Sequence, residues 1–320
     1  MRLAVVVPCR DGRRWLPGLL ASLRAQTRQP DVLLVVDDAS ADGSAAWLRE
    51  QGVDVLVLER NAGFAAAANR GVEAVDADAV ALLNTDVVLA PDWLERTAGR
   101  LGPGVAAVAT KMVSLDAPAI LDDCGDVLRR DGVCEQRGHG RRDDGRYDEP
   151  GEVFAACAGA ALYRREAVLA LGGFEESFFA YLEDADLGLR LRLAGWSCAY
   201  EPAVARHAGQ GSASALPRPV RRLVARNTLL LVARHFPLRW AGPVAYRQLA
   251  WLWHAGREGA LRDHLLGLAD GLRMLPAALR DRHVHADVGR VVPPLPWRGP
   301  SAGGHRLHVD HAAAGRASRK

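Results

Sequence analysis

The sequence has no hydrophobic run long enough to cross a membrane and no cysteine pair with the spacing of a metal site. Its longest uncharged apolar stretches, such as residues 153–163, fall well short of the roughly 20 residues that a spanning helix needs. The first residues run directly into a strand-like segment without a charged and then apolar leader, which indicates no signal peptide. Five scattered cysteines favour reduced thiols, so we expect a cytoplasmic protein.

Glycine-rich phosphate loops are also missing, because neither GxGxxG nor GxxxxGK[ST] occurs in the chain. A nucleotide bound by this protein would therefore not be held in the manner of those loops. Its diphosphate would need a metal ion to neutralise it, and a hard carboxylate suits Mg²⁺ or Mn²⁺.

Charge is unevenly distributed between the two parts of the chain. Residues 206–320 contain 19 Lys and Arg against 6 Asp and Glu, a net charge of +13. Residues 1–205 contain 22 against 32, a net charge of −10. The basic part indicates an anionic neighbour, such as phospholipid headgroups or a phosphate-bearing substrate, or else a solvated basic face. We expect no nucleic acid as a partner.

Short β-branched runs alternate with helical patterns through the first 115 residues. The expected strands are 3–7, 32–36, 53–58, 79–83 and 105–110. Apolar strands separated by helices of about ten to fifteen residues indicate βαβ units and a parallel sheet buried on both faces. The predicted fold class is therefore α/β.

Changes in composition divide the chain into four expected segments. Their boundaries are 1–115, 116–212, 213–290 and 291–320. Within the second segment, residues 116–151 are polar and predict a long loop or a hairpin. The third segment is helical and arginine-rich, and the last is expected to be disordered.

Three tryptophans lie in the helical third segment, in an amphipathic context: Trp240, Trp251 and Trp253. Two interpretations remain open for them. They either pack inside the helical segment or, with the surrounding arginines, place a helix at a membrane interface.

Polar residues follow the first four expected strands, and three of these strand ends carry aspartate. They are Asp11, the pair Asp37 and Asp38, and Asp86. Ligands of open parallel α/β sheets bind beyond the carboxyl ends of the strands. Asp86, at the end of a buried strand, is the expected metal ligand.

Residues 181–190, YLEDADLGLR, place three carboxylates within four positions: Glu183, Asp184 and Asp186. Like charges this close raise one another's pKa. One interpretation is a charged helix start, because acids in a first turn complement the helix dipole. The other is a general base in an active site.

Eight motifs follow one another along residues 3–212: VVVPCRDG, SLRAQT, VVDDASADGS, NAGFAAAANRG, LLNTDVVL, CAGAALYRREAVLALGGFEESFF, EDADLGLRLRLAGW and HAGQGS. In this order and spacing they resemble the inverting nucleotide-sugar glycosyltransferases of family 2, in the rhamnosyltransferase-like branch. The resemblance implies a GT-A fold, a Rossmann-like mixed sheet with helices on both faces. Residues 1–115 would be its donor-binding half and 116–212 its acceptor and catalytic half, followed by the helical extension.

The resemblance also implies roles for individual residues. It assigns donor binding to Pro8, Asp37, Asp38, Asn61, Gly63, Asn69, Asn84 and Asp86. It places Asp86 and His207 at the metal ion, makes Asp184 the catalytic base beside Glu183, and puts Asp186 and Trp196 on the acceptor side. The chain departs from the family pattern at two places. Asn84 replaces the first acid of the DxD motif, and Arg10 and Asp11 stand where Tyr-Asn is common.

The implied activity is inverting, metal-dependent transfer of a sugar from a nucleoside-diphosphate donor to a glycan, lipid-linked or small-molecule acceptor. The resemblance favours dTDP-rhamnose, with UDP- and GDP-sugars as alternatives. It also implies a cytoplasmic place, or a peripheral one at the inner membrane face through the basic C-terminal helices. Two other classes remain open: a non-catalytic nucleotide-sugar-binding module, and a nucleotidyltransferase, which would need the glycine-rich loop that VVVPCRDGRRW does not supply.

Overall fold

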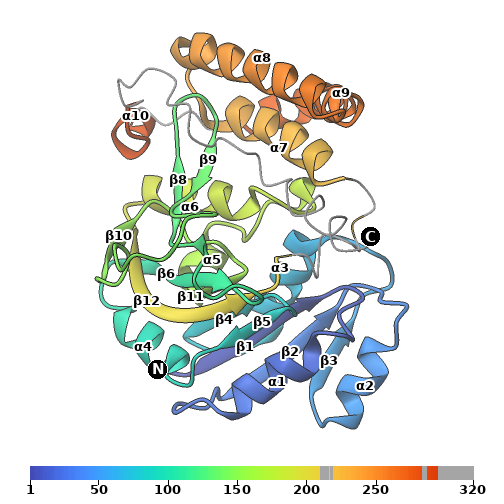
Figure 1. Ribbon diagram of the computed structural model, residues 1–320, viewed down its shortest axis with the longest axis vertical. Coiled ribbons are helices and arrows are strands. Elements are labelled where there is room, and N and C mark those ends of the chain that lie inside the picture. The colour runs from blue at the N-terminus through green and yellow to red at the C-terminus, as the bar shows by residue number, and fades with distance from the viewer. Residues whose placement is uncertain (210–215, 217–218, 283–286, 295–320) are drawn as a thin grey trace. The chain divides into compact units, whose positions relative to one another are not determined.

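The computed structural model describes residues 1–209, 216, 219–282 and 287–294, and they fall into two compact units. The first unit comprises residues 1–127 and 135–215, and the second comprises 128–134 and the chain from 216 onward. Figure 1 labels their elements.

The strands of the described chain are β1 (Leu3–Cys9), β2 (Val32–Asp37), β3 (Asp54–Val57), β4 (Ala79–Leu83), β5 (Val87–Leu89), β6 (Val105–Ser114), β7 (Leu121–Asp123), β8 (Asp126–Leu128), β9 (Cys134–Gln136), β10 (Gly151–Val153), β11 (Ala160–Arg164) and β12 (Ser197–His207). The helices of the first unit are α1 (Leu16–Arg24), α2 (Ser44–Glu50), α3 (Phe64–Ala74), α4 (Trp93–Arg100), α5 (Arg165–Ala170), the 3-10 turn η1 (Glu176–Phe178) and α6 (Glu183–Leu193).

The main sheet has the order β10-β12-β6-β11-β4-β1-β2-β3, with β5 added beside β12 and β7 beside β6. Its first half is parallel, since β4, β1, β2 and β3 pair in parallel and helices α1 to α3 form the crossovers. Strand β11 then runs antiparallel between β4 and β6. The α/β fold class with a mixed sheet is confirmed.

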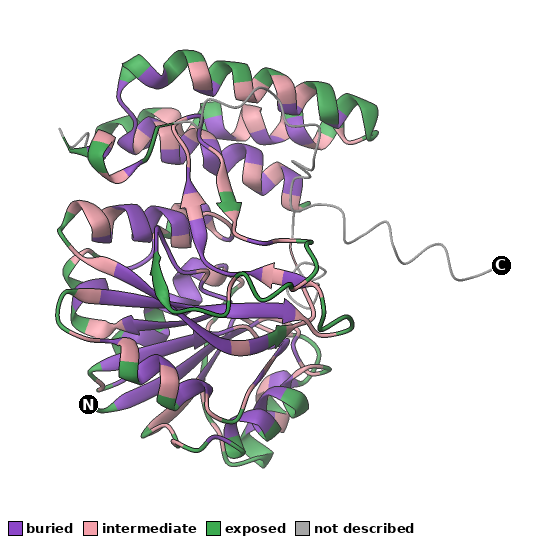
Figure 2. Cartoon of the chain, turned by 60° about the vertical axis from the view of Figure 1, so that its left-hand side comes forward, coloured by how far each residue is buried: buried purple, intermediate pink, exposed green. Residues whose placement is uncertain are grey.

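Alternate residues of each central strand enter two different cores, because successive side chains point to opposite faces of a sheet. On β1, Ala4 and Val6 join the core under α3 and α6, whereas Val5 and Val7 join the core under α1, α2 and α4. Figure 2 shows how continuously the central strands are buried. A sheet buried on both faces explains why these strands are apolar without interruption.

All five strands expected in the first 115 residues are present. The segment 116–151, expected to be a loop or hairpin, contains the strand β7 and the two-stranded sheet β8-β9. The predicted disorder of 291–320 concerns residues that lie, from 295 onward, outside the described part of the chain.

The second unit is helical, as predicted. Its elements are α7 (Val220–His235), the 3-10 turn η3 (Leu238–Trp240), α8 (Ala241–Arg257), α9 (Leu261–Arg280) and α10 (Val288–Val291). Within the described ranges, none of the helices combines the length and the apolar content that crossing a bilayer requires.

Candidate active site

Two chain segments bring a carboxylate and an imidazole together at the end of the parallel sheet. Asp86 follows β4 and is 2% exposed, while His207 is the last residue of β12. β12 pairs with β5 through His207 and Val87, which fixes His207 beside the turn after β4. The Nε2 atom of His207 consequently lies 3.3 Å from Oδ1 of Asp86 and 3.3 Å from Nδ2 of Asn84.

The other ring nitrogen of His207 contacts a second aspartate. Nδ1 lies 2.7 Å from Oδ2 of Asp122, a residue of β7. The ring of His139 approaches the same residue, with its Nδ1 2.8 Å from the main-chain oxygen of Asp122 and 3.4 Å from Oδ1. Asp122 thus lies between His139 and His207, which are 68 residues apart in the sequence.

These contacts strongly shift the pKa values of His207, Asp122 and His139. Burial opposes a charge on His207, but its contacts with Asp122 and Asp86 outweigh that effect and raise its pKa to about 10. Burial likewise opposes a charge on Asp122, yet His139 and His207 hold the pKa of its carboxyl well below the ordinary range. The hydrogen bond to Asp122 raises the pKa of His139.

Asp86 and His207 fit a divalent cation. Two neighbouring ligands of an octahedral ion, each bound at about 2.1 Å, lie about 3 Å apart, and the two facing atoms here are separated by 3.3 Å. Among the described residues, no three His, Cys, Asp or Glu side chains converge as a ligand group. A site with so few protein ligands is typical of Mg²⁺ or Mn²⁺ held jointly with substrate phosphates.

Asp184 lies in the first turn of α6, where its carboxylate is held by backbone groups. Oδ1 accepts a hydrogen bond from the N–H of Ala185 at 2.8 Å, and Oδ2 accepts one from the N–H of Ala158 at 3.3 Å. The next residue, Gly159, accepts a hydrogen bond from the N–H of Asn84 at 2.8 Å. Residues 158 and 159 therefore join the base candidate to the strand end that carries Asp86.

Burial raises the pKa of Asp184. Burial also raises the pKa of the neighbouring Glu183 well above its ordinary value, and the negative charge of Asp184 raises it further. Two further acids in this region respond similarly. Burial, aided by the charges of Asp122 and Asp184, raises the pKa of Asp123 to about 8. Burial also raises the pKa of Asp126 well above its usual range. The predicted crowding of carboxylates is thus larger than the motif alone contains.

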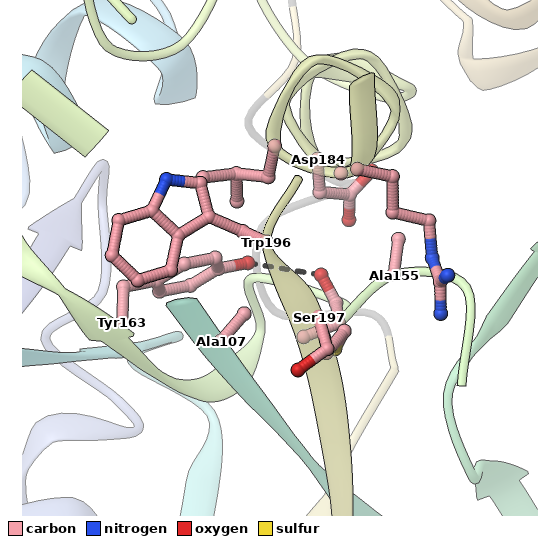
Figure 3. Close-up of a pocket in the computed structure, with 11 residues that line it drawn as sticks. Ala107, Ala155, Tyr163, Asp184, Trp196 and Ser197 are labelled. Carbon is pink, nitrogen blue, oxygen red and sulfur yellow. Dashed lines mark hydrogen bonds between the residues drawn. The ribbon is translucent and has the colours of Figure 1, made fainter. Parts of the chain in front are cut away.

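A small cavity lies under α6 and against the sheet. Its volume is about 10 Å³, roughly the space of one water molecule. Figure 3 shows Asp184, Tyr163 and Trp196 around it, with the Tyr163 hydroxyl donating to the main-chain oxygen of Ala156 at 2.9 Å. The cavity is too small for a sugar, so substrates must approach Asp184 from elsewhere.

The turn that precedes α6 has an unusual backbone. Phe179, Tyr181 and Leu182 have positive φ angles of 65°, 72° and 69°, which side chains other than glycine rarely adopt. Such strain is typical of functional sites, where the surrounding structure holds it in place. Here the main-chain oxygen of Phe179 accepts a hydrogen bond from the N–H of Ala65 at 3.1 Å, which ties the turn to α3.

Two of the predicted donor residues organise the segments around them. Asp38 accepts hydrogen bonds from the N–H groups of Ala62 and Gly63, at 2.6 and 2.9 Å. Asn69 is 6% exposed and exchanges two hydrogen bonds with the main chain of Phe174. Both residues therefore shape the loop and helix that border the donor side.

The remaining donor residues have less defined contacts. Pro8 is buried in β1, where it pairs with Val36 of β2, and Asn61 is half-buried. Asp37 is 1% exposed and accepts a hydrogen bond from the N–H of Ser40 at 3.1 Å. Its Oδ1 atom has no hydrogen-bond partner among the residues that the structure describes.

The acceptor-side prediction for Asp186 does not agree with its burial. Its side chain is 1% exposed and forms an ion pair with Arg190 at 2.7 Å. Arg190 in turn donates to the main-chain oxygens of Leu171 and Gly173, so Asp186 anchors α6 to the preceding segment. Trp196 is half-buried, packs against the core and stacks under Arg164.

Four residues of this site were not predicted from the sequence: Asp122, His139, Ala158 and Gly159. The first two lie in the segment expected to be a loop, and the last two act through backbone groups. Backbone contacts leave no signature in residue type. The neighbouring acids Asp122 and Asp123 were the only feature of the segment's sequence that could have indicated a role in the site.

Solved structures identify the fold. A mannosyltransferase from Pyrobaculum calidifontis, in complex with GDP-Man and Mn²⁺, matches 87% of this chain and 78% of its own with a TM-score of 0.54 and 18% identity. GalNAc-T7 with UDP, GalNAc and Mn²⁺ matches 74% of this chain and 48% of its own with a TM-score of 0.57 and 13% identity. The fold is that of the GT-A glycosyltransferases.

Relatives in sequence identify the family. The sequence model of the family described as "Glycosyl transferase family 2" matches residues 4–172. An N-acetylglucosaminyl-diphospho-decaprenol L-rhamnosyltransferase of Mycobacterium tuberculosis is 30% identical over 286 residues, which cover 78% of this chain and 88% of the relative. A pre-mycofactocin glycosyltransferase of the same species is 32% identical over 208 residues, 62% of this chain and 41% of the relative. This chain belongs to glycosyl transferase family 2 and is a glycosyltransferase.

Proposed function

We propose that this enzyme transfers a sugar, with inversion, from a nucleoside-diphosphate donor to a hydroxyl group of a lipid-linked glycan. The acceptor oxygen attacks the anomeric carbon from the face opposite the nucleoside diphosphate. The new carbon–oxygen bond forms as the bond to the diphosphate breaks, and Asp184 takes the proton of the acceptor hydroxyl. A positioned base of this kind contributes about 10²–10⁴-fold to the rate.

The observation that carries this proposal is the backbone bridge through residues 158 and 159. It links Asp184 to the strand end bearing Asp86, through hydrogen bonds of 3.3 and 2.8 Å. The base and the diphosphate-binding end of the sheet are thereby fixed near each other. The raised pKa of Asp184 suits a residue that must gain a proton during the reaction.

Asp86 and His207 would hold the Mg²⁺ or Mn²⁺ ion, with Asn84 beside them. When bound, the ion supplies Lewis-acid stabilisation of the negative charge on the departing diphosphate. Asn84 contributes no charge to this site, so His207 becomes the second ligand that the motif alone does not provide.

The donor and acceptor are proposed from the relatives. dTDP-rhamnose is the favoured donor because an L-rhamnosyltransferase is similar over most of both chains. The printed name of that relative gives an acceptor attached to decaprenol diphosphate. A polyprenol acceptor lies in a membrane, so we place this enzyme at the inner face of the cytoplasmic membrane.

The exposed apolar side chains of α8 support a membrane contact. Tyr246, Leu249 and Trp253 are 67%, 66% and 68% exposed and follow one another at helical spacing. Of the three tryptophans singled out in the sequence, Trp240 and Trp251 are instead buried, at 5% and 6% exposure, and serve packing. Trp and Tyr are favoured at membrane–water interfaces because their rings are amphipathic.

Helix α9 also carries a row of leucines. Six leucines recur at alternating spacings of four and three residues, at positions 261, 265, 268, 272, 275 and 279. Leu265, Leu272 and Leu279 are 48%, 61% and 43% exposed. Apolar side chains on a helix pair with an excess of arginine are typical of interfacial helices that lie on anionic lipid.

Two of the three acids in residues 241–280 pair with arginines of the helical unit. Glu258 pairs with Arg221, and Asp270 pairs with Arg222 at 2.7 Å. Residues 241–280 contain five arginines against three acids, a net charge of +2. We propose that α8 and α9 rest on an anionic bilayer, whereas a second copy of the chain would bring two positive surfaces together.

The proposed function is tested by incubating the purified protein with dTDP-rhamnose, UDP- and GDP-sugars and a short-chain polyprenyl-diphosphate N-acetylglucosamine, with and without Mn²⁺. We expect release of the nucleoside diphosphate only with the matching donor and acceptor, and an inverted anomeric configuration in the product by NMR. Retention of configuration would overturn the assignment of Asp184 as a base in a single displacement.

Two other outcomes would replace the proposal. Thermal stabilisation by a nucleoside diphosphate without turnover would indicate a binding module. Release of pyrophosphate from a nucleoside triphosphate and a sugar phosphate would indicate a nucleotidyltransferase.

A further inference from the structure

Asp122, a residue of the polar segment 116–151, contacts His207. Its side chain is 14% exposed and that of His207 is 15% exposed, so their 2.7 Å contact is largely shielded from water. Asp122 belongs to β7, which pairs with β6, the neighbour of the strand β12 that ends at His207. The contact is therefore fixed by three adjacent strands.

The chemistry of imidazole gives this contact a direction. A ring nitrogen that faces a carboxylate at 2.7 Å carries the hydrogen, because the carboxylate can only accept. Nδ1 of His207 is thus the donor to Asp122, and Nε2 faces Asp86 at 3.3 Å. Without a metal ion Nε2 also carries a hydrogen, which a bound cation would displace. Histidines that bind metals commonly donate their second N–H to a carboxylate in this way.

His139 fixes Asp122 from the other side. Its Nδ1 atom lies 2.8 Å from the main-chain oxygen of Asp122 and 3.4 Å from Oδ1. The turn that carries His139 is joined to β7 by the N–H of Gly140, which donates to the main-chain oxygen of Leu121 at 2.9 Å. The order His139, Asp122, His207, Asp86 is therefore one continuous chain of polar contacts.

We propose that Asp122 is the positioning residue for His207, holding the hydrogen on Nδ1 and directing Nε2 toward the cation site at Asp86. The segment 116–151 thereby acquires a function in the metal site, although it contributes no ligand. This inference rests on the proposed function, because that function requires the cation.

The test uses Mn²⁺ affinity, measured by electron paramagnetic resonance in the presence of dTDP and of UDP. Asp122→Ala is expected to weaken Mn²⁺ binding about 10- to 100-fold, the usual loss when a carboxylate behind a metal-binding histidine is removed. Asp122→Asn is expected to restore much of that loss, because an amide oxygen still accepts from Nδ1. It also keeps the inference testable if the alanine variant fails to fold.

A matched control separates positioning from a general loosening of the segment. Asp143 lies in the same segment and pairs with Lys111 at 2.6 Å, away from His207. Asp143→Asn should leave Mn²⁺ affinity unchanged. Equal affinity in the wild type and Asp122→Ala, or an equal loss in Asp143→Asn, would overturn the inference.

A metal-free readout distinguishes this inference from the proposed function. In ¹⁵N NMR spectra of the full chain without metal, the Nδ1–H of His207 should be observed in the wild type, held by its hydrogen bond to Asp122, and should exchange with water in Asp122→Ala. If the wild type bound no Mn²⁺ but still showed the protected Nδ1–H, the proposed metal site would be wrong and the role of Asp122 in holding His207 would stand. Wild-type protein with the hydrogen on Nε2 only would contradict the role of Asp122.

Discussion

Asp184 is half-buried and has a raised pKa, while Glu183 and Asp186 beside it are 5% and 1% exposed. Only one acid of the motif can therefore reach a substrate. Asp184→Asn should lower kcat by about 10²–10⁴-fold, because an amide cannot take the proton. The stabilisation of the protein by nucleoside diphosphate and Mn²⁺, measured as a shift in Tm, should stay unchanged.

Asp186→Asn is the matched comparison for that prediction. It breaks the buried ion pair with Arg190 and so should lower Tm while leaving kcat within a few-fold of the wild type. If Asp184→Asn kept near wild-type turnover, the base would have to be another residue.

Asp123 makes the stability of the enzyme depend on pH. Burial raises its pKa from the ordinary 3.8 to about 8. A carboxyl whose pKa is raised by folding stabilises the folded state fully below its unfolded pKa, and that contribution is lost as the pH rises through the folded pKa. Asp123→Asn, which mimics the protonated form, should therefore gain in Tm relative to the wild type between about pH 4 and pH 8.

Differential scanning calorimetry over that pH range checks this prediction. Asp144→Asn, at an exposed site in a surface ion pair, should show a difference in Tm that hardly varies with pH. A constant difference between Asp123→Asn and the wild type would show that Asp123 is ionised throughout.

At the level of single residues, Asp86 was predicted from its place after a buried strand, Asp184 from the crowding of acids, and His207 from the family resemblance. The structure brings Asp86 and His207 to within 3.3 Å of each other. Asp122 could not be paired with His207 from the sequence, since they are 85 positions apart and no periodic pattern links them. The burial of Asp186 likewise depends on Arg190 reaching carbonyl oxygens of another segment.

Among the elements, the start of α3 packs closely against the turn before α6. Gly63 has a φ angle of 92°, and a Cβ atom there would lie 2.5 Å from the ring of Phe179 and 2.6 Å from its main-chain oxygen. Gly63→Ala would combine overpacking with an extended backbone at positive φ (ψ 167°), which only glycine readily adopts, so it should destabilise the protein by about 2–5 kcal/mol. Urea unfolding measures this loss.

Gly43 supplies the control for Gly63. It also has a positive φ angle, 81°, but a Cβ atom there would meet nothing within 4 Å. Gly43→Ala should therefore cost only about 1–2 kcal/mol, the conformational part alone. Equal losses at both positions would mean that the approach of Phe179 to Gly63 is not tight in solution.

The strands of the parallel half could be predicted because each is an uninterrupted apolar run flanked by turn residues. Strands β5, β7, β8, β9 and β10 are three residues long and were not resolved individually from the sequence. A three-residue strand is too short to display alternation. Its existence depends on pairing with a neighbour, as β7 depends on β6.

For the whole molecule, the unequal charge of the two chain halves was readable from the sequence, but the surface on α8 was not. Only the structure separates the exposed Trp253 from the buried Trp240 and Trp251. The relevant quantity is exposure, which depends on how the helices pack, and an amphipathic pattern alone does not decide which apolar residues are covered.

The double variant Leu249→Ser with Trp253→Ser tests the membrane contact. Each buried side chain of this size contributes about 1.5–3 kcal/mol, so the loss of both should weaken binding to vesicles containing phosphatidylglycerol at least about 10-fold. Cosedimentation with these vesicles and with neutral phosphatidylcholine vesicles measures the effect. Leu169→Ser, at an apolar position of the first unit that is 36% exposed, is the control.

Several outcomes of that experiment would contradict the membrane contact. One is that the wild type sediments equally with neutral and anionic vesicles. Another is that Leu169→Ser weakens vesicle binding as much as the double variant does. A stable dimer in sedimentation velocity that the double variant dissociates would assign the surface to a second copy instead.

The short excursion of residues 128–134 into the helical unit has a consequence for synthesis. Asp131 is 3% exposed and pairs with Arg247, which lies 116 residues further along the chain. At about 5–20 residues per second, a ribosome needs roughly 6 to 23 s to deliver that partner. During this interval Asp131 has its contact with Arg129 at 3.6 Å but lacks Arg247, and a premature stop after residue 215 would leave it without Arg247 permanently.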